Sequence, residues 1–125
     1  MDSIIVKLEG EVPSKKNSRN IVKAGNGRRY VVASDAYTRW HRAVMPILRA
    51  KAPAAPVASP VKVIIEFVHG DRRRRDHNNQ AASVMDALVD AGILADDSWT
   101  IVREESYSGF YEQGNAGCGI WITEI

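Results

Sequence analysis

The stretch VKVIIEFVHG, residues 61–70, decides the fold. Its first eight residues are almost continuously apolar and rich in β-branched side chains, and Gly70 ends the run. An apolar run of this kind is typical of a strand in the middle of a sheet. We therefore predict a central strand over residues 61–68 and place the other elements around it.

Two helices are predicted, one before this strand and one after it. The first begins at Ser34, a good N-cap residue, and the neighbouring Asp35 suits the positive end of the helix dipole. Pro46 lies inside the pattern and is expected to kink or weaken the last turn. The apolar residues of this helix follow at helical spacing and are Tyr37, Trp40, Val44 and Ile47.

The second helix is predicted over residues 79–91, with Gly92 as its C-terminal stop. Its apolar face consists of Ala81, Val84, Met85 and Leu88. Its polar face consists of Asn79, Ser83, Asp86 and Asp90. This helix should therefore present two acids on the side opposite its apolar face.

The remaining strands are expected to complete one mixed β-sheet. They cover residues 3–8, 29–32, about 100–107 and 119–123, with a turn over residues 113–117. Residues 10–27 are interpreted as a mobile loop, because they hold Pro13, Gly25 and Gly27 and lack regular periodicity. The result is an α+β fold with two main helices, and the length of 125 residues predicts a single domain over residues 1–125.

The composition excludes several classes of protein. A single cysteine, Cys118, rules out an internal disulfide and a Cys-based zinc site, and we interpret it as a buried strand thiol.

Trp40 is assigned to the core, and Trp99 to the core or a dimer interface, with base stacking as the alternative. No signal-peptide pattern or membrane-length apolar run occurs, so a cytoplasmic protein without membrane contact is expected.

The net charge of +2 hides an uneven distribution of basic residues. Residues 12–34 hold six basic side chains and no acid, and residues 72–75 are four consecutive arginines. Two basic segments beside an acidic remainder predict a track for a phosphate backbone, with solvated loops as the alternative interpretation. The predicted DNA contacts are Lys15, Lys16, Asn17, Arg19, Arg28, Arg29, Arg72, Arg73, Arg74 and Arg75.

The acids gather in a different part of the chain. Six of the 15 acids fall within residues 71–97, and four of them are considered as site residues. Asp76 precedes the second helix, Asp86 lies on it, and Asp96 and Asp97 follow it. Mutually repelling carboxylates need compensation, and Mg²⁺ or Mn²⁺ prefers carboxylate and amide oxygens as ligands. Such a metal lowers the pKa of a bound water and stabilises charge on a phosphodiester.

Each of these residues also has a purely structural interpretation. The pair Asp96 and Asp97 is compatible with a simple turn, and Asp86 and Asp90 with solvated helix positions. His77 is compatible with a solvent-facing loop histidine as well as with a metal ligand or a base. Spacing alone leaves these alternatives open.

The acidic block resembles the pattern of a known family. The segments RRDHNN (74–79), MDAL (85–88) and GILADD (92–97) are similar to the Arg-Asp-x-Asp-Asn, Asp-Ala-Leu and closing Asp-Asp motifs of the RusA family. These are Holliday junction resolvases found in bacteria and prophages. The segment PSKKNS (13–18) looks like the family's Pro-Ser-x-Asn loop, and residues 29–34 resemble its Arg-x-Tyr segment. The resemblance covers roughly residues 5–107.

The resemblance implies a homodimeric endodeoxyribonuclease that uses Mg²⁺, or Mn²⁺ as an alternative. It would make paired cuts in opposed strands of a four-way DNA junction during recombination and repair. A two-fold dimer suits a branched DNA of approximate two-fold symmetry. The implied catalytic residues are Asp76, Asn78, Asp96 and Asp97. The implied metal ligands are Asp76, Asn79, Asp86 and Asp97.

Two positions depart from the family pattern. Asn78 stands where the commonest pattern has a second metal-binding Asp, and Ala82 stands where it has a lysine. Arg73, Arg74 or Arg75 would then supply the phosphate-binding cation. A branched-DNA-binding protein that cuts weakly or not at all is therefore the alternative function. A metal-dependent hydrolase of small phosphates is a third hypothesis, which the two basic segments argue against.

Overall fold

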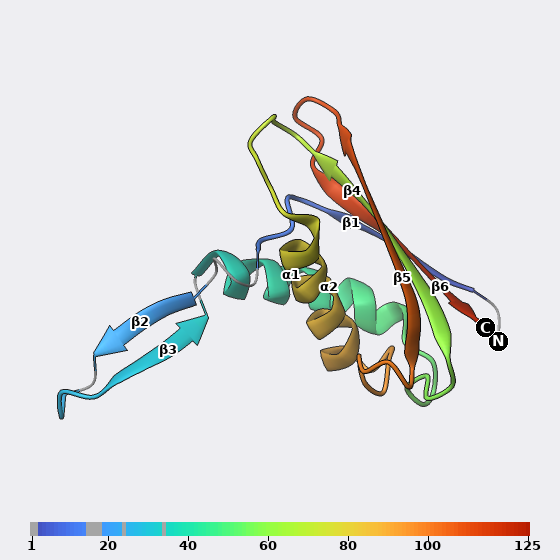
Figure 1. Ribbon diagram of the computed structural model, residues 1–125, viewed down its shortest axis with the longest axis horizontal. Helices are drawn as coiled ribbons and strands as arrows, with labels where there is room; N and C mark the ends of the chain where they lie inside the picture. Colours follow the sequence, from blue (N-terminus) through green and yellow to red (C-terminus); the bar gives the residue numbers. More distant parts are fainter. Residues whose placement is uncertain (1–2, 15–18, 24, 34) are drawn as a thin grey trace.

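The computed structural model describes residues 3–14, 19–23, 25–33 and 35–125. The predicted α+β class is confirmed, with one mixed sheet and two main helices in this part of the chain (Figure 1). In chain order the elements are β1 (Ile4–Glu9), β2 (Arg19–Lys23), β3 (Arg29–Ala33), α1 (Asp35–Lys51), β4 (Val61–His69), α2 (His77–Asp90), β5 (Val102–Tyr111) and β6 (Gly117–Glu124).

The main sheet has the strand order β1-β6-β4-β5. β4 pairs antiparallel with β6 and parallel with β5, so the predicted central position of residues 61–68 is confirmed. The side chains of β4 alternate, however: Val63, Ile65 and Phe67 are fully buried, whereas Ile64 and Glu66 on the other face are half-buried. One face of the sheet therefore carries the core, and the apolar residues on the other face are only partly covered.

Both helices lie on the same side of this sheet (Figure 1). α1 buries Trp40, Val44 and Leu48, which confirms the core assignment of Trp40. Pro46 lies inside α1, yet the helix continues to Lys51. Leu48, beyond the proline, is fully buried, and burial of such a side chain contributes about 1.5–3 kcal/mol, which helps to hold the last turn in place. Ser34, the predicted N-cap, lies outside the described residues.

α2 begins two residues earlier than predicted and ends as expected. Its predicted apolar face is buried, and Gly92 follows the helix with a φ of 79°, the left-handed conformation that favours glycine. The prediction for Ser83 was wrong, because this residue is fully buried instead of lying on the polar face. Its hydroxyl donates a hydrogen bond of 2.7 Å to the carbonyl oxygen of Pro13.

The interpretation of residues 10–27 as one loop was also wrong. β2 and β3 form an antiparallel hairpin, which projects away from the main sheet and the helices (Figure 1). The apolar part of β2 is only Ile21 and Val22, too short to display a period of two in the sequence. Its pairing partner β3 lies six residues further along the chain, so the strand depends on that local partner.

Two single residues test the burial predictions. Cys118 lies in β6 and is 2% exposed, and burial raises the pKa of its thiol to about 12, so the predicted buried strand thiol is confirmed. Trp99 is 74% exposed, which rules out the core assignment and leaves the interface and base-stacking alternatives. Neither helix in the described part of the chain is long and apolar enough to span a membrane.

Candidate active site

The candidate site lies at the N-terminal end of α2. Asp76 is the N-cap residue, with φ −102° and ψ 114°, but its side chain makes no capping hydrogen bond. An N-cap aspartate ordinarily accepts a hydrogen bond from the first turn of its helix. Here only the Asp76 carbonyl oxygen accepts, from the backbone of Asn79 and Gln80. The exposed carboxylate is therefore available at the positive end of a helix, where anionic groups are stabilised.

A cavity of about 400 Å³ opens beside this carboxylate. Three segments meet there: the chain leaving β1, the arginine run and the first turn of α2. The cavity is lined by Glu11, Val12, Pro13, Ser14, Arg74, Arg75, Asp76, Asn79 and Gln80. The fold therefore gathers four of the predicted site residues, Asp76, Asn79, Arg74 and Arg75, at one place.

Two residues of α2 hold the chain that leaves β1 against the helix. Gln80 is 2% exposed, and its amide nitrogen donates to the carbonyl oxygen of Val12 at 2.8 Å and to Glu11 Oε2 at 2.9 Å. Ser83 binds the next carbonyl, that of Pro13. These bonds fix the start of the predicted Pro-Ser-x-Asn loop beside Asp76. Lys15, Lys16 and Asn17 lie outside the described residues.

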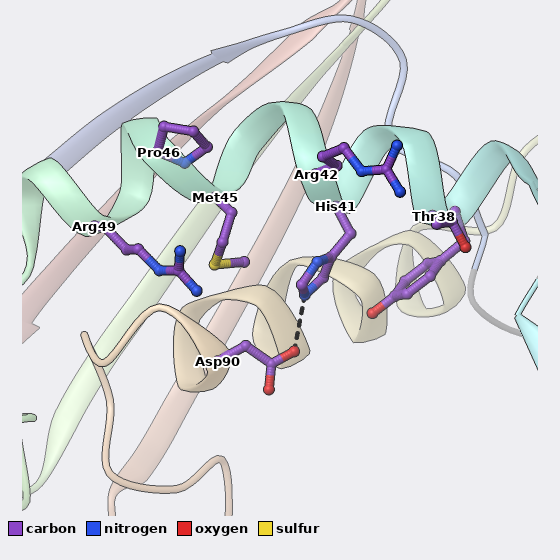
Figure 2. A pocket seen from close by; sticks show the side chains of 8 residues that line it. Thr38, His41, Arg42, Met45, Pro46, Arg49 and Asp90 are labelled. Atoms are coloured by element: carbon purple, nitrogen blue, oxygen red, sulfur yellow. Dashed lines mark hydrogen bonds and ion pairs between the residues drawn. The ribbon is translucent and has the colours of Figure 1, made fainter.

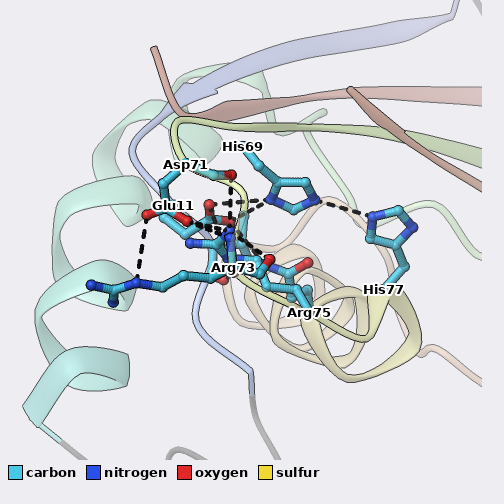
Figure 3. A network of polar contacts seen from close by, with 8 residues as sticks. Glu11, His69, Asp71, Arg73, Arg75 and His77 are labelled. Carbon is cyan, nitrogen blue, oxygen red and sulfur yellow. Dashed lines mark hydrogen bonds and ion pairs between the residues drawn. The ribbon is translucent and has the colours of Figure 1, made fainter. Parts of the chain in front are cut away.

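Glu11 is the centre of the polar network around this cavity (Figure 3). Besides Gln80, it accepts hydrogen bonds from His69 Nδ1 at 3.0 Å and forms an ion pair with Arg75 Nε at 3.2 Å. The side chains of His69 and Arg75 are 14% and 16% exposed. Charge-assisted bonds between part-buried groups are stronger than those in open solvent. Glu11 therefore joins the ends of β1 and β4 to the start of α2.

The arginine run does not act as one uniform patch. Arg75 forms ion pairs with Glu11 and, at 2.9 Å, with Asp71. The hydrogen bond from Arg75 is the main cause that lowers the pKa of Asp71 to about 2. Arg72 lies over the ring of Tyr111, 4.1 Å from its centroid, in a cation–π contact. Arg73 is 84% exposed, and its Nε forms a long ion pair of 3.9 Å with Asp71 Oδ2. Arg74 lines the cavity and has no ion-pair partner among the described residues.

His77 is not a solvent-facing loop residue, which was one of the alternatives that the sequence left open. It is the first residue of α2, half-buried, and its Nε2 lies 3.1 Å from His69 Nε2. Its ring stacks on Phe67 with the centroids 5.0 Å apart. Burial, followed by repulsion from His69, lowers the pKa of His77. A Cβ at Gly109 of β5 would lie 2.6 Å from His77 Nε2, so the ring requires glycine there.

The other predicted acids lie elsewhere. Asp86 is half-buried on α2, ten residues or about 15 Å along the helix from Asp76, and its charge helps to raise the pKa of Tyr37, after burial. Asp96 and Asp97 are exposed beyond the far end of α2, where the Asp97 N–H donates to Asp96 Oδ1 at 2.9 Å. Asn78 is exposed on the first turn. Within residues 3–14, 19–23, 25–33 and 35–125, no three His, Cys, Asp or Glu side chains are grouped to hold a metal ion.

The remaining predicted DNA contacts belong to the hairpin. Arg19 lies on β2 and Arg29 on β3, at the two ends of the paired register. Arg28 is exposed next to the hairpin turn, and its backbone N–H donates to Asn26 Oδ1 at 3.0 Å. The hairpin therefore carries the predicted basic residues away from the main body of the domain.

Sequence reasoning missed Glu11, His69 and Gln80, which hold the cavity together. Glu11 is separated from His69 by 58 positions and from Gln80 by 69, so no local pattern connects them. The usable signal was the polar pair His69 and His77 at the two ends of the arginine segment. Such residues contact one another only after β4 and α2 have packed.

The site combines an exposed carboxylate at the start of a helix with Arg74, which has no ion-pair partner among the described residues. On an α+β scaffold, this combination suits the binding of phosphate esters. The family model described as Endodeoxyribonuclease RusA matches residues 10–123, nearly the whole chain. The chain therefore belongs to the RusA family of endodeoxyribonucleases, whose members resolve Holliday junctions. The resemblance seen in the sequence motifs is confirmed. A search of curated proteins found no significant match.

Proposed function

We propose that this chain is a Mg²⁺-dependent endodeoxyribonuclease that resolves four-way DNA junctions by paired strand cuts in recombination and repair. The observation that carries the proposal is the cavity at the start of α2, which is lined by both Arg74 and Asp76, whose carboxylate does not cap the helix. Mn²⁺ is the alternative metal, and the cytoplasm is the proposed location. Family membership supports nuclease action on branched DNA.

The oxygen groups at this cavity fit a hard cation. Asp76 offers a carboxylate, and Asn79 offers an amide oxygen. Gln80 Oε1 is buried and has no hydrogen-bond partner in the part of the chain that the structure describes, although the amide nitrogen of the same side chain makes two bonds. An orphaned buried acceptor costs about 1–3 kcal/mol, which a cation or a bound water would relieve. Mg²⁺ prefers oxygen ligands, and when bound it would acidify water and stabilise charge on the phosphate.

The protein's own groups have separate roles in this proposal. Arg74 would bind the phosphate, because Arg75 is already engaged by Glu11 and Asp71. Glu11 would position the loop beside Asp76 without touching DNA. Asn78, exposed on the same turn, would orient the phosphate or a water as an uncharged donor and acceptor.

A homodimer would complete the acidic set. Asp76 precedes α2 and Asp97 follows it, and a helix of 14 residues is about 21 Å long. A helix of that length between them argues against one metal held by both acids of a single chain. In a two-fold dimer, Asp76 of one copy can meet Asp96 and Asp97 of the other. The exposed Trp99 beside Asp97 supports a covering partner at this end.

The test is cleavage of a labelled four-way junction by Asp76→Asn, Asp97→Asn and an equimolar mixture of the two with exchanged subunits. Each variant alone should bind the junction without cutting it. The mixture should regain roughly a quarter of the wild-type sites, because heterodimers keep one site with both acids. Linear duplex of the same sequence and reactions in EDTA are the controls and should remain uncut.

Three outcomes would count against parts of this proposal. Normal cleavage by Asp76→Asn would reject the site itself. A mixture that exchanges subunits yet stays inactive would place the metal site within one chain. Tight junction binding by the wild type without cuts in Mg²⁺ or Mn²⁺ would favour the alternative of a branch-binding protein, which the substitutions Asn78 and Ala82 motivate.

A further inference from the structure

A second groove lies between α1 and α2, away from the cavity at Asp76 (Figure 2). It encloses about 550 Å³ and is lined by one face of α1 and by Asp90 near the end of α2. Met45 and Pro46 form an apolar part of its wall, and Arg42 and Arg49 flank them along α1. Neither arginine belongs to the DNA contacts predicted from the sequence.

The charges in this groove are unequally satisfied. His41 Nε2 lies 2.9 Å from Asp90 Oδ2, so the acid in the groove already has a partner. Arg42 and Arg49 are both exposed, and neither has an ion-pair partner among the residues that the structure describes. Two guanidinium groups without an ion-pair partner among the described residues outnumber the single acid of the groove and favour an anionic ligand over a cation.

The geometry of α1 suits an extended polyanion. Arg42 and Arg49 are seven residues apart, so they are separated by about 10.5 Å along the helix, close to the rise of three nucleotides in B-form DNA. α1 also begins directly after the basic hairpin. Of the seven basic residues outside the two basic segments, four lie on α1, namely Arg39, Arg42, Arg49 and Lys51.

We propose that the groove between α1 and α2 is a second DNA-backbone site, in which Arg42 and Arg49 each bind a phosphate. The inference rests on the proposed junction-resolving function. Because Asp90, the last residue of α2, lines the groove, the two arginines would supply cations at the end of α2 that leads to Asp96 and Asp97. Arg74 does the same at the Asp76 end.

The principal experiment measures binding of a fluorescent four-way junction in EDTA, across a range of salt concentrations. The double variant Arg42→Ala/Arg49→Ala should weaken binding about tenfold or more and reduce the salt slope by about two. The matched control is Lys7→Ala/Lys62→Ala, which removes two cations from the main sheet, outside the groove. Its salt slope should stay close to that of the wild type.

A second variant tests the sign of the effect. Asp90→Asn keeps a polar partner for His41 but removes the negative charge from the groove. The junction should then bind about two- to fivefold more tightly, since a phosphate in the groove no longer meets a carboxylate.

Thermal unfolding midpoints should match the wild type for the arginine variants, because both side chains are exposed.

The outcomes separate this inference from the proposed function. If the wild type binds the junction but the arginine pair behaves like the lysine control, the second site is rejected and the nuclease proposal stands. If Asp90→Asn weakens binding, the groove does not hold a phosphate. If the wild type shows no junction binding, the proposed function fails, and this inference fails with it.

Discussion

The two ends of α2 differ in how much of their site one chain has already built. At the N-terminal end, Glu11 collects His69, Arg75 and Gln80 into a part-buried network beside Asp76. At the C-terminal end, Asp97 is exposed, and its backbone N–H donates a hydrogen bond to Oδ1 of the neighbouring Asp96. The difference is that one end is preorganised within the chain, whereas the acids at the other end lie exposed without such a network among the described residues.

The largest expected effect comes from removing the acid at either end of α2, which tests whether both ends contribute to cleavage. Asp76→Asn and Asp97→Asn should each lower the junction cleavage rate by more than about 100-fold, because loss of a group that only supports a metal ligand already costs 10–100-fold. Junction affinity in EDTA should stay within about twofold of wild type, since neither acid binds a phosphate. A large loss for Asp76→Asn with normal cleavage by Asp97→Asn would confine the reaction to the preorganised end.

The preorganised end extends to β5, and Gly109 tests how rigid it is. A Cβ there would lie 2.6 Å from His77 Nε2, so Gly109→Ala should displace the ring from Phe67 and His69. Overpacking of this kind costs about 1–3 kcal/mol in the free energy of unfolding. Urea denaturation measures the loss, with Ser106→Ala on the exposed part of β5 as the control. A Gly109→Ala protein as stable as wild type would mean that the ring moves freely.

Glu11→Gln probes the same network with a smaller change. The variant keeps the shape of the side chain but removes the charge that holds Arg75 and His69. Bonds to charged groups contribute about 1.5–3 kcal/mol, and partial exposure of Glu11 reduces the expected loss of unfolding free energy to about 1–2 kcal/mol. Glu9→Gln, an exposed residue of β1, should change it by less than about 0.5 kcal/mol.

The two ends also differ in how far the sequence could reveal them. The strand over residues 61–68, the apolar face of α2 and the stop at Gly92 follow from local periodicity, and the structure confirms them. Asp76 was predicted as a site residue because it belongs to a compact motif. The Glu11 network was missed, because its members come from separate elements that only the packed fold brings together.

The errors have similar physical causes. Ser83 was assigned to the polar face of α2 because its helical spacing places it with Asn79, Asp86 and Asp90, but a carbonyl 70 positions away satisfies its buried hydroxyl. Arg42 and Arg49 belong to no basic run in the sequence, and it is helical periodicity that places both on one face of α1. In each case the missing information was which distant element lies opposite the residue.

The smallest expected effect is the pH dependence of the preorganised end. Burial and His69 lower the pKa of His77 in the folded protein, whereas an unfolded histidine keeps a pKa of about 6.5. As the pH falls below 6.5, the unfolded chain takes up this proton first, so the free energy of unfolding declines down to the folded pKa. His77→Gln removes this contribution, and urea denaturation between pH 7.5 and pH 5.5 should show a shallower decline than in the wild type. An identical pH profile for the two proteins would show that the histidine is not held in its neutral form. The polar network at the start of α2 would then depend on the contacts of Glu11 and not on a neutral His77.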